Sequence, residues 1–238
     1  MSLGAVDQPS RGLLGRLQAL LFPSRCPGCG LRGVLLCGDC ARRLPWLGPD
    51  VCPRCAEPRR SGWICGRCRA GSAPLDGVRA ACRFEGLARQ SVHDLKYRGA
   101  RVRAPLLAEL LEQALAARPI RFDVLVPVPL SPERRRQRGF NQAELVARAL
   151  GERIGVPVDP DALARVRDTP RQVGRTGQAR EQNVADAFAC PSPEAVRGRR
   201  VGVLDDVMTT GATLRACATA LRTAGAERVY GLVVAREV

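Results

Sequence analysis

From residue 78 onward, short apolar runs alternate with longer stretches in which apolar residues recur every three or four positions. Runs without a helical period predict buried strands. They span residues 78–84, 122–130, 198–206 and 228–237. Stretches with a period near 3.6 residues predict helices. They span residues 104–118, 141–155 and 212–225.

Continuous apolar strands separated by helices are typical of a mostly parallel sheet. The sequence therefore predicts an α/β domain whose sheet is flanked by helices, with a charged loop between residues 130 and 141. Asn141 followed by Glu144 is a typical start signal for the helix that follows this loop. In such sheets ligands bind beyond the carboxyl ends of the strands.

The first third of the chain has few large apolar residues and contains four Cys-x-x-Cys pairs. The pairs are Cys26/Cys29, Cys37/Cys40, Cys52/Cys55 and Cys65/Cys68. Two intervening residues let both thiolates face one tetrahedral ion, with Zn–S bonds of about 2.3 Å. We therefore expect a small double zinc ribbon with two structural zinc ions, each held by four thiolates. Sequential pairing of the knuckles is favoured, and the spacing leaves a cross-brace open.

These patterns divide the chain into four expected parts. They are an N-terminal amphipathic segment at 1–24 with leucines at helical spacing, the double zinc ribbon at 25–70, a linker at 71–77 and the α/β domain at 78–238.

Charge narrows the partners that the chain can bind. The 238 residues carry 38 Lys and Arg against 23 Asp and Glu, a formal net charge of +15. This excess favours nucleic acid, phosphorylated metabolites or an acidic protein as partners. A solvated arginine-rich surface explains the same excess without any partner. Aromatic residues make up only 4% of the chain, which weakens the case for stacking on single-stranded DNA.

The chain contains no apolar run near the roughly 20 residues that a membrane helix needs. The stretch LLGRLQALLF at 13–22 is broken by Arg16 and is not followed by a small-residue cleavage site. We therefore expect a cytoplasmic protein without stable membrane insertion. In that compartment the paired cysteines are metal ligands rather than disulfides.

The predicted strand at 198–206 ends in two adjacent acids, and a run of small hydroxylated residues follows it. The run comprises Thr209, Thr210, Gly211, Ala212 and Thr213. Free backbone N–H groups at the start of the next helix form an anion cradle, to which the threonine hydroxyls add donors. Asp205 and Asp206 would repel a phosphate unless they served other groups, such as sugar hydroxyls or a bridging Mg²⁺. A phosphorylated ribose satisfies both ends of this loop.

The segment LDDVMTTGAT resembles the phosphoribosyl pyrophosphate (PRPP) loop of type I phosphoribosyltransferases. The resemblance extends to the ComF family of competence-associated proteins and covers nearly the whole chain from about residue 20. It is carried by LKYRG at 95–99, VPVPLSPERRRQRGFNQAELVA at 126–147, RVRDTPRQ at 165–172, RxxNVxxAF at 180–188, the loop itself and the cysteine pairs.

The resemblance implies that Asp205 and Asp206 hold the ribose hydroxyls of PRPP, with Mg²⁺ nearby, and that Thr209–Thr213 hold the 5′-phosphate. It implies catalytic roles for Arg138 and Arg180. Lys96 is the only lysine of the chain, which makes it a further catalytic candidate as an anion ligand. Arg134 and Asn141 are implied pyrophosphate-loop contacts, and Thr169 and Gln172 belong to the implied mobile loop. Many purine-salvage members have an Asp where this chain has Thr209, so hypoxanthine or guanine is not the expected acceptor.

Two functions follow from this resemblance. The first is a phosphoribosyltransferase with an unidentified acceptor, linked to competence and DNA uptake. The second is a non-catalytic competence factor that binds single-stranded DNA and docks a helicase-like partner through the zinc module.

Overall fold

The computed structural model describes residues 6–7, 25–59, 63–71, 74–167 and 186–238. The predicted amphipathic segment at 1–24 lies outside these residues, except for residues 6–7. None of the helices in the described ranges combines the length and apolar character that crossing a bilayer requires.

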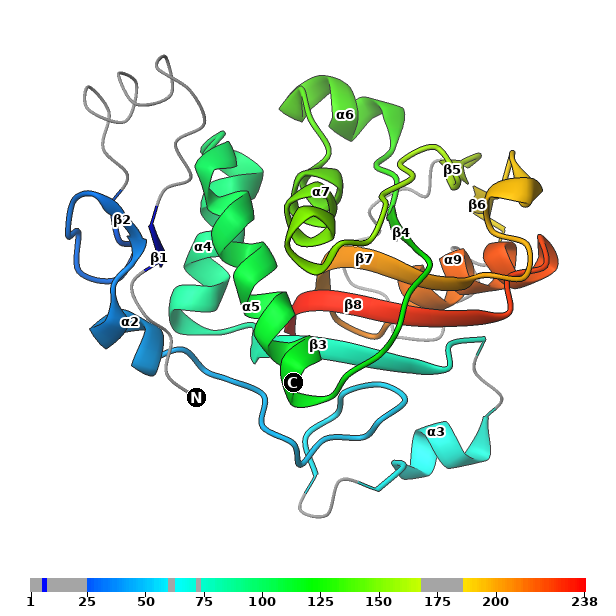
Figure 1. Ribbon diagram of the computed structural model, residues 1–238, viewed down its shortest axis with the longest axis horizontal. Coiled ribbons are helices and arrows are strands. Elements are labelled where there is room, and N and C mark those ends of the chain that lie inside the picture. The colour runs from blue at the N-terminus through cyan, green and yellow to red at the C-terminus, as the bar shows by residue number, and fades with distance from the viewer. Residues whose placement is uncertain (1–5, 8–24, 60–62, 72–73, 168–185) are drawn as a thin grey trace, which may run out of the picture.

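The secondary structure elements follow one another in the order shown in Figure 1. They are β1 (Val6–Asp7), β2 (Val34–Leu36), α2 (Gly38–Arg42), α3 (Gly66–Ala70), β3 (Gly77–Arg83), α4 (Gly86–Tyr97), η1 (Arg101–Arg103), α5 (Ala104–Ala117), β4 (Val124–Pro127), α6 (Pro132–Arg138), α7 (Gln142–Ile154), β5 (Ala164–Arg165), β6 (Phe188–Ala189), η2 (Pro193–Ala195), β7 (Arg200–Met208), α9 (Ala212–Thr223) and β8 (Arg228–Arg236).

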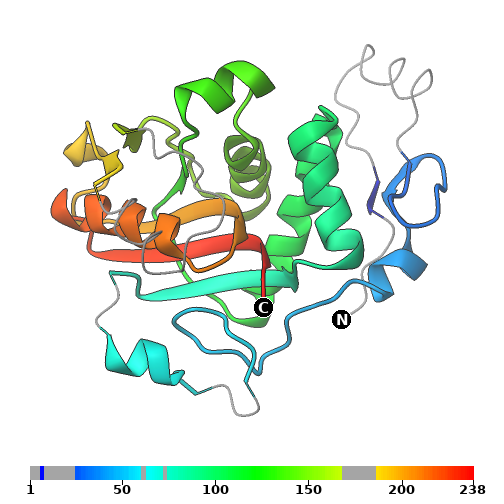
Figure 2. The ribbon, with the colours of Figure 1, turned by 180° about the vertical axis from the view of Figure 1, so that it is seen from behind.

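The main sheet confirms the predicted fold class. Its strands lie in the order β3-β8-β7-β4 and every neighbouring pair is parallel. Helices α5 and α7 cover one face of the sheet, and α9 covers the other, as the two opposite views show (Figures 1 and 2). Because β7 and β8 are covered on both faces, they are apolar along most of their length.

The segment between β4 and α7 is a helix rather than the predicted charged loop. Ser131 caps α6, since its hydroxyl accepts a hydrogen bond from the Arg134 N–H at 3.4 Å. Pro132 stands in the first turn, and Gly139 ends the helix with a φ of 71°. These are ordinary start and stop signals, and they outweigh the lack of apolar periodicity.

Two predicted strands also differ in length from those observed. The strand predicted at 122–130 is shortened to β4, Val124–Pro127. The strand predicted to end at residue 206 continues to Met208, because Met208 still pairs with Arg236 of β8.

The cysteine-rich segment wraps around the β3 edge of the sheet (Figure 2). Residues 45–47 run antiparallel to β3: the Leu47 N–H donates to Ala81 O at 2.9 Å and the Arg83 N–H donates to Pro45 O at 2.8 Å. The cysteines on either side of this stretch belong to two different buried clusters of the α/β domain. The zinc module therefore shares its core with that domain.

The end of the predicted linker at 71–77 is anchored in the described structure. Leu75 is buried, and the Asp76 carboxylate accepts a hydrogen bond from the Val229 N–H at 2.8 Å. Asp76 also pairs with Arg222 and, at 2.9 Å, with Arg228. These contacts fix the start of β3 beside the start of β8.

Candidate functional site

Both acids of the loop lie in the last part of β7, two to three residues before the strand ends. Asp206 is buried, with 3% of its surface exposed. Its Oδ2 atom has no hydrogen-bond partner among the described residues. A buried carboxylate oxygen is normally satisfied, so this atom is free to accept from a ligand hydroxyl or to face a cation.

Asp205 lies beside it and is half-buried. Its Oδ1 accepts a hydrogen bond from the Asp206 N–H at 2.8 Å. Burial raises the pKa of Asp205 to about 7, and the negative charge of Asp206 adds to the shift, while Lys96 and Arg134 partly oppose it. Holding two adjacent carboxylates ionised therefore costs free energy in the absence of a ligand.

This raised pKa predicts that Asp205→Asn stabilises the protein, and does so increasingly as the pH rises. The folded-state pKa lies above the unfolded value, so the cost is absent below about pH 4 and complete above about pH 7. We expect the stability gain of the variant to grow by about 1 kcal/mol from about pH 6 to about pH 8. Urea unfolding at both pH values measures the gain. Asp161→Asn, which changes an exposed carboxylate, is the control, and an equal gain for Asp205→Asn at both pH values would contradict the prediction.

Lys96 reaches the acids from the last turn of α4. Its Nζ lies 2.7 Å from Asp206 Oδ1, and 19% of the Lys96 side chain is exposed. The sequence suggested Lys96 as an anion ligand, whereas in the structure it neutralises a carboxylate. His93, one turn earlier, is exposed and packs against Tyr97 with tilted rings, 4.7 Å between ring centroids.

The loop after β7 turns at Gly211, which caps α9 with a φ of 80°. A Cβ at this position would lie 3.1 Å from the Met208 side chain, so both the conformation and the space favour glycine. Thr209 is exposed, and the Thr210 hydroxyl accepts from the Ala212 N–H at 3.4 Å. Ala212 and Thr213 form the first turn of α9, so their N–H groups lie at the positive end of the helix.

Arginines of α6 approach the site from the end of β4. Arg134 is half-buried, and its charge lowers the pKa of Asp205. The Arg138 guanidinium lies 5.2 Å from the Tyr97 ring centroid, next to Lys96, and donates to Gln142 Oε1 at 2.7 Å. The structure thus brings residues of α4, α6 and β7 together at the carboxyl edge of the sheet.

Asn141 has both ends of its side chain engaged within the chain. Its Nδ2 donates to Val128 O at 3.0 Å, and its Oδ1 accepts from the Ala143 N–H at 3.0 Å. These bonds fix the start of α7 to the end of β4, so Asn141 positions the elements around the site. Thr169, Gln172 and Arg180 lie outside the described residues.

Three further residues of the site carried no individual signal in the sequence. Tyr97 is exposed and Gln142 is buried, and both contact Arg138. Arg215 donates from Nη1 to Thr210 O at 2.9 Å and so brings positive charge to the loop at residues 209–213. Its place one turn into α9 is apparent only after the helix start is known.

The eight paired cysteines form two clusters, and within each cluster the four Sγ atoms lie within 4.8 Å of one another. The first comprises Cys26, Cys29, Cys37 and Cys40, and the second comprises Cys52, Cys55, Cys65 and Cys68. The pairing is therefore sequential, and the cross-brace is excluded.

Distances within the clusters fit zinc. The Sγ–Sγ separations include 3.8 Å for Cys26 and Cys37 and 3.7 Å for Cys55 and Cys65. A tetrahedron with Zn–S bonds of about 2.3 Å has edges of about 3.8 Å. A Cβ on Gly28 would lie 2.5 Å from Cys40 Sγ, so this knuckle requires glycine. Burial raises the pKa of Cys40 to about 12, so a bound cation is needed to keep this sulfur as a thiolate.

Protein-family models match both the cysteine-rich part and the α/β part of the chain. Residues 17–69 match the model of the double zinc ribbon domain, and residues 101–237 match that of the phosphoribosyl transferase domain. The DNA utilization protein YhgH of Salmonella typhi is 32% identical over 221 residues, which cover 88% of this chain and 96% of that protein. Competence protein F of Haemophilus influenzae is 37% identical over 113 residues, 46% of this chain and 49% of that protein.

A solved structure of glutamine PRPP amidotransferase from B. subtilis, complexed with ADP and GMP, is also similar. The identity is 27% and the TM-score 0.38, over 55% of this chain and 25% of that chain. This chain therefore spans about a quarter of that enzyme's length.

Proposed function

We infer the function of this chain from its family. The chain belongs to the ComF-type competence family, in which a double zinc ribbon precedes a phosphoribosyltransferase domain. The chain binds PRPP together with Mg²⁺ and transfers the phosphoribosyl group to a nucleophilic acceptor. The activity serves competence and DNA use, which the names of its relatives describe.

The observation that carries this proposal is the Asp206 Oδ2 atom, which has no partner in the described part of the chain and lies on the strand that leads into the Gly211 turn. A buried acceptor and a helix N-terminus joined by one short loop suit a ligand with hydroxyls at one end and a phosphate at the other. Asp205 and Asp206 are assigned to the ribose hydroxyls. The 5′-phosphate is assigned to Thr209, Thr210, Gly211, Ala212 and Thr213.

The positive charge around Asp205 and Asp206 suits pyrophosphate, the leaving group of this reaction. In this reaction the bond from the ribose C1 to pyrophosphate breaks while a nucleophile bonds to C1. Arg134 and Arg138 are assigned to the departing pyrophosphate, whose developing charge fixed guanidinium groups would stabilise. Bound Mg²⁺ would add to this neutralisation, with Asp205 and Asp206 as the carboxylates nearest to it. Arg180, Thr169 and Gln172 are assigned to a loop that closes over the site.

Lys96 is assigned the role of balancing the charge of the two acids. By neutralising Asp206 it lets two adjacent carboxylates coexist without a ligand. Asn141 is assigned to position the pyrophosphate-binding helix rather than to contact the ligand.

The test is calorimetric titration of the zinc-loaded protein with PRPP, with and without Mg²⁺. We expect saturable, Mg²⁺-dependent binding that Asp205→Asn/Asp206→Asn weakens by about 100-fold or more, since at least two charge-assisted hydrogen bonds are lost. Asp161→Asn, a surface change, should bind as the parent does. Unchanged PRPP affinity in the double variant would reject the assignment of the loop, and absence of binding to the parent protein would reject phosphoribosyl transfer.

A second function, binding of single-stranded DNA by the zinc module, is favoured by one observation. The Trp63 side chain is 71% exposed and lies beside Arg54 and Arg69 on the second ribbon. An exposed indole between guanidinium groups can stack a base while the arginines contact phosphate. The same surface is our proposed docking site for a helicase-like competence partner. If PRPP does not bind, oligonucleotide titration of the parent and Trp63→Ala proteins is the next measurement.

We also propose a domain division and a location for the protein. The boundaries 1–24, 25–70, 71–77 and 78–238 are proposed as the domain division. A cytoplasmic location is proposed because PRPP and reduced cysteines are both found there.

A further inference from the structure

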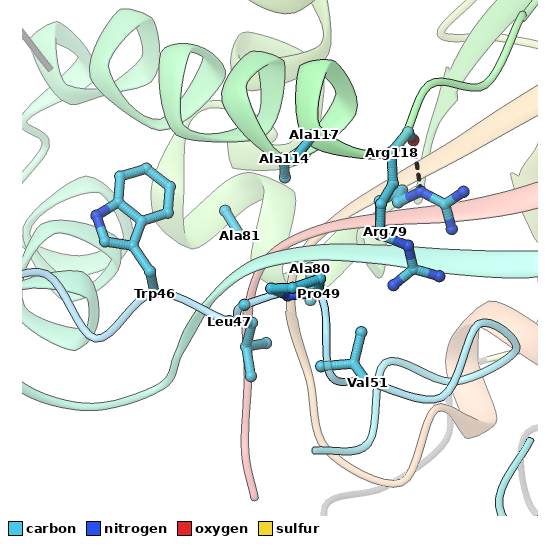
Figure 3. A pocket seen from close by; sticks show the side chains of 11 residues that line it. Trp46, Leu47, Pro49, Val51, Arg79, Ala80, Ala81, Ala114, Ala117 and Arg118 are labelled. Carbon is cyan, nitrogen blue, oxygen red and sulfur yellow. Dashed lines mark hydrogen bonds between the residues drawn. The ribbon is translucent and has the colours of Figure 1, made fainter. Parts of the chain in front are cut away.

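A small cavity lies between the zinc module and the α/β domain at the outer edge of β3. It has a volume of about 90 Å³ and lies between residues 46–51, β3 and the end of α5 (Figure 3). None of the residues that line it belongs to the candidate PRPP site. The walls are apolar: Ala114 comes from α5, and Leu47 and Val51 come from the segment along β3.

One end of the cavity carries two positive charges. Figure 3 shows the guanidinium groups of Arg79 and Arg118 close together, with no acidic residue among those lining the cavity. Arg79 is half-buried, and its Nε donates to Arg118 O at 2.8 Å. Burial, together with the nearby charge of Arg118, lowers the pKa of Arg79 to about 10. No hydrogen bond or ion pair neutralises the Arg118 guanidinium within the described part of the chain.

The other end of the cavity is aromatic. The Trp46 indole lies there, opposite the guanidinium groups (Figure 3), and its Nε1 donates to Ala41 O at 3.4 Å. Trp46 also pairs with Cys82 of β3 through its backbone. The Trp46 ring is therefore held in place at the apolar end of the cavity, opposite the two guanidinium groups.

We propose that this cavity binds a small organic carboxylate with a compact apolar body. The carboxylate pairs with Arg79 and Arg118, and the body lies against Trp46 and the neighbouring apolar walls. Two converging guanidinium groups without an acid favour an anion, and the planar donor arrangement of arginine suits a carboxylate in particular. A volume of about 90 Å³ is smaller than the about 150 Å³ of an engineered cavity that holds benzene, so it suits a short-chain carboxylate of propionate size.

The test uses propionate and its neutral analogue propionamide. The chain contains two tryptophans, so Trp63→Phe leaves Trp46 as the sole indole reporter next to the cavity. We expect propionate to change Trp46 fluorescence saturably and propionamide to bind far more weakly. Arg118→Gln, in the same background, should weaken propionate binding by about tenfold, the effect of losing one charge-assisted hydrogen bond. Arg121→Gln, at an exposed arginine three residues along, should leave it unchanged.

Three outcomes would overturn the proposal. They are the absence of a saturable signal with propionate, equal binding of propionate and propionamide, and equal propionate affinity in the parent and Arg118→Gln proteins. None of these three outcomes depends on the PRPP site, so each proposal can be rejected without affecting the other.

Discussion

A Cys40→Ser variant is expected to bind one zinc ion per chain instead of two and to unfold at the first ribbon. Cys40 is fully buried and is one of four sulfurs in its cluster. Structural zinc contributes about 10–16 kcal/mol in small finger peptides, which is comparable to the whole stability of an ordinary domain. A serine hydroxyl replaces the thiolate poorly, so much of this contribution is lost.

The loss should extend into the α/β domain. Arg103, at the start of α5, is buried and donates to Leu35 O at 3.0 Å and to Arg25 O at 2.8 Å, both in the first ribbon. Unfolding the ribbon removes these acceptors and leaves a guanidinium without partners. The first core cluster also loses Cys26, Leu35 and Leu36.

Zinc content and thermal unfolding together measure the effect. Cys52→Ser should remove the other zinc ion, and Cys82→Ala, at a buried cysteine outside both clusters, should retain both. Two zinc ions in the Cys40→Ser protein would show that this cysteine is not a ligand.

Replacing Lys96 by methionine is expected to destabilise the protein by about 3 kcal/mol at neutral pH, because a buried charge loses its partner. Only 4% of the Asp206 side chain is exposed, and its other oxygen already lacks a partner among the described residues. In the variant, the Asp206 carboxylate is left buried without its ion-pair partner.

A double-mutant cycle isolates this interaction. Lys96→Met/Asp206→Asn should recover most of the stability lost in Lys96→Met, since both charges are then absent. Denaturant unfolding of the four proteins gives the coupling free energy. Additive losses in the double variant would show that the 2.7 Å contact contributes little and that Lys96 acts through packing.

Features set by neighbouring residues could be predicted from the sequence. The eight ligands follow from the two-residue spacing within each pair, and the four strands of the main sheet and helices α5, α7 and α9 follow from their apolar periods, whereas α4 does not. The turn after β7 follows from the small residues around Gly211. Helix α6 buries none of its residues, so it has no apolar period, and only Ser131, Pro132 and Gly139 signal its start and end.

The tertiary structure alone decided which distant residues meet. Lys96 and Asp206 come from opposite ends of the domain's sequence, and no local pattern indicates that α4 ends beside β7. Packing likewise pairs Arg138 with Tyr97 and holds Arg79 near Arg118 in the cavity at β3. Spacing identified the eight zinc ligands but left a cross-brace open. The folded chain excluded it, because it brings the Sγ atoms of sequential knuckles within 4.8 Å of one another.

The sequence by itself therefore determined the elements, the metal ligands and the chemistry of the loop, since each depends on residues a few positions apart. The strand order, the charge balance around Asp205 and Asp206, and the junction between zinc module and sheet were decided by the folded chain. They depend on contacts between distant segments, which form only when the apolar faces of α5, α7 and α9 are buried against the sheet.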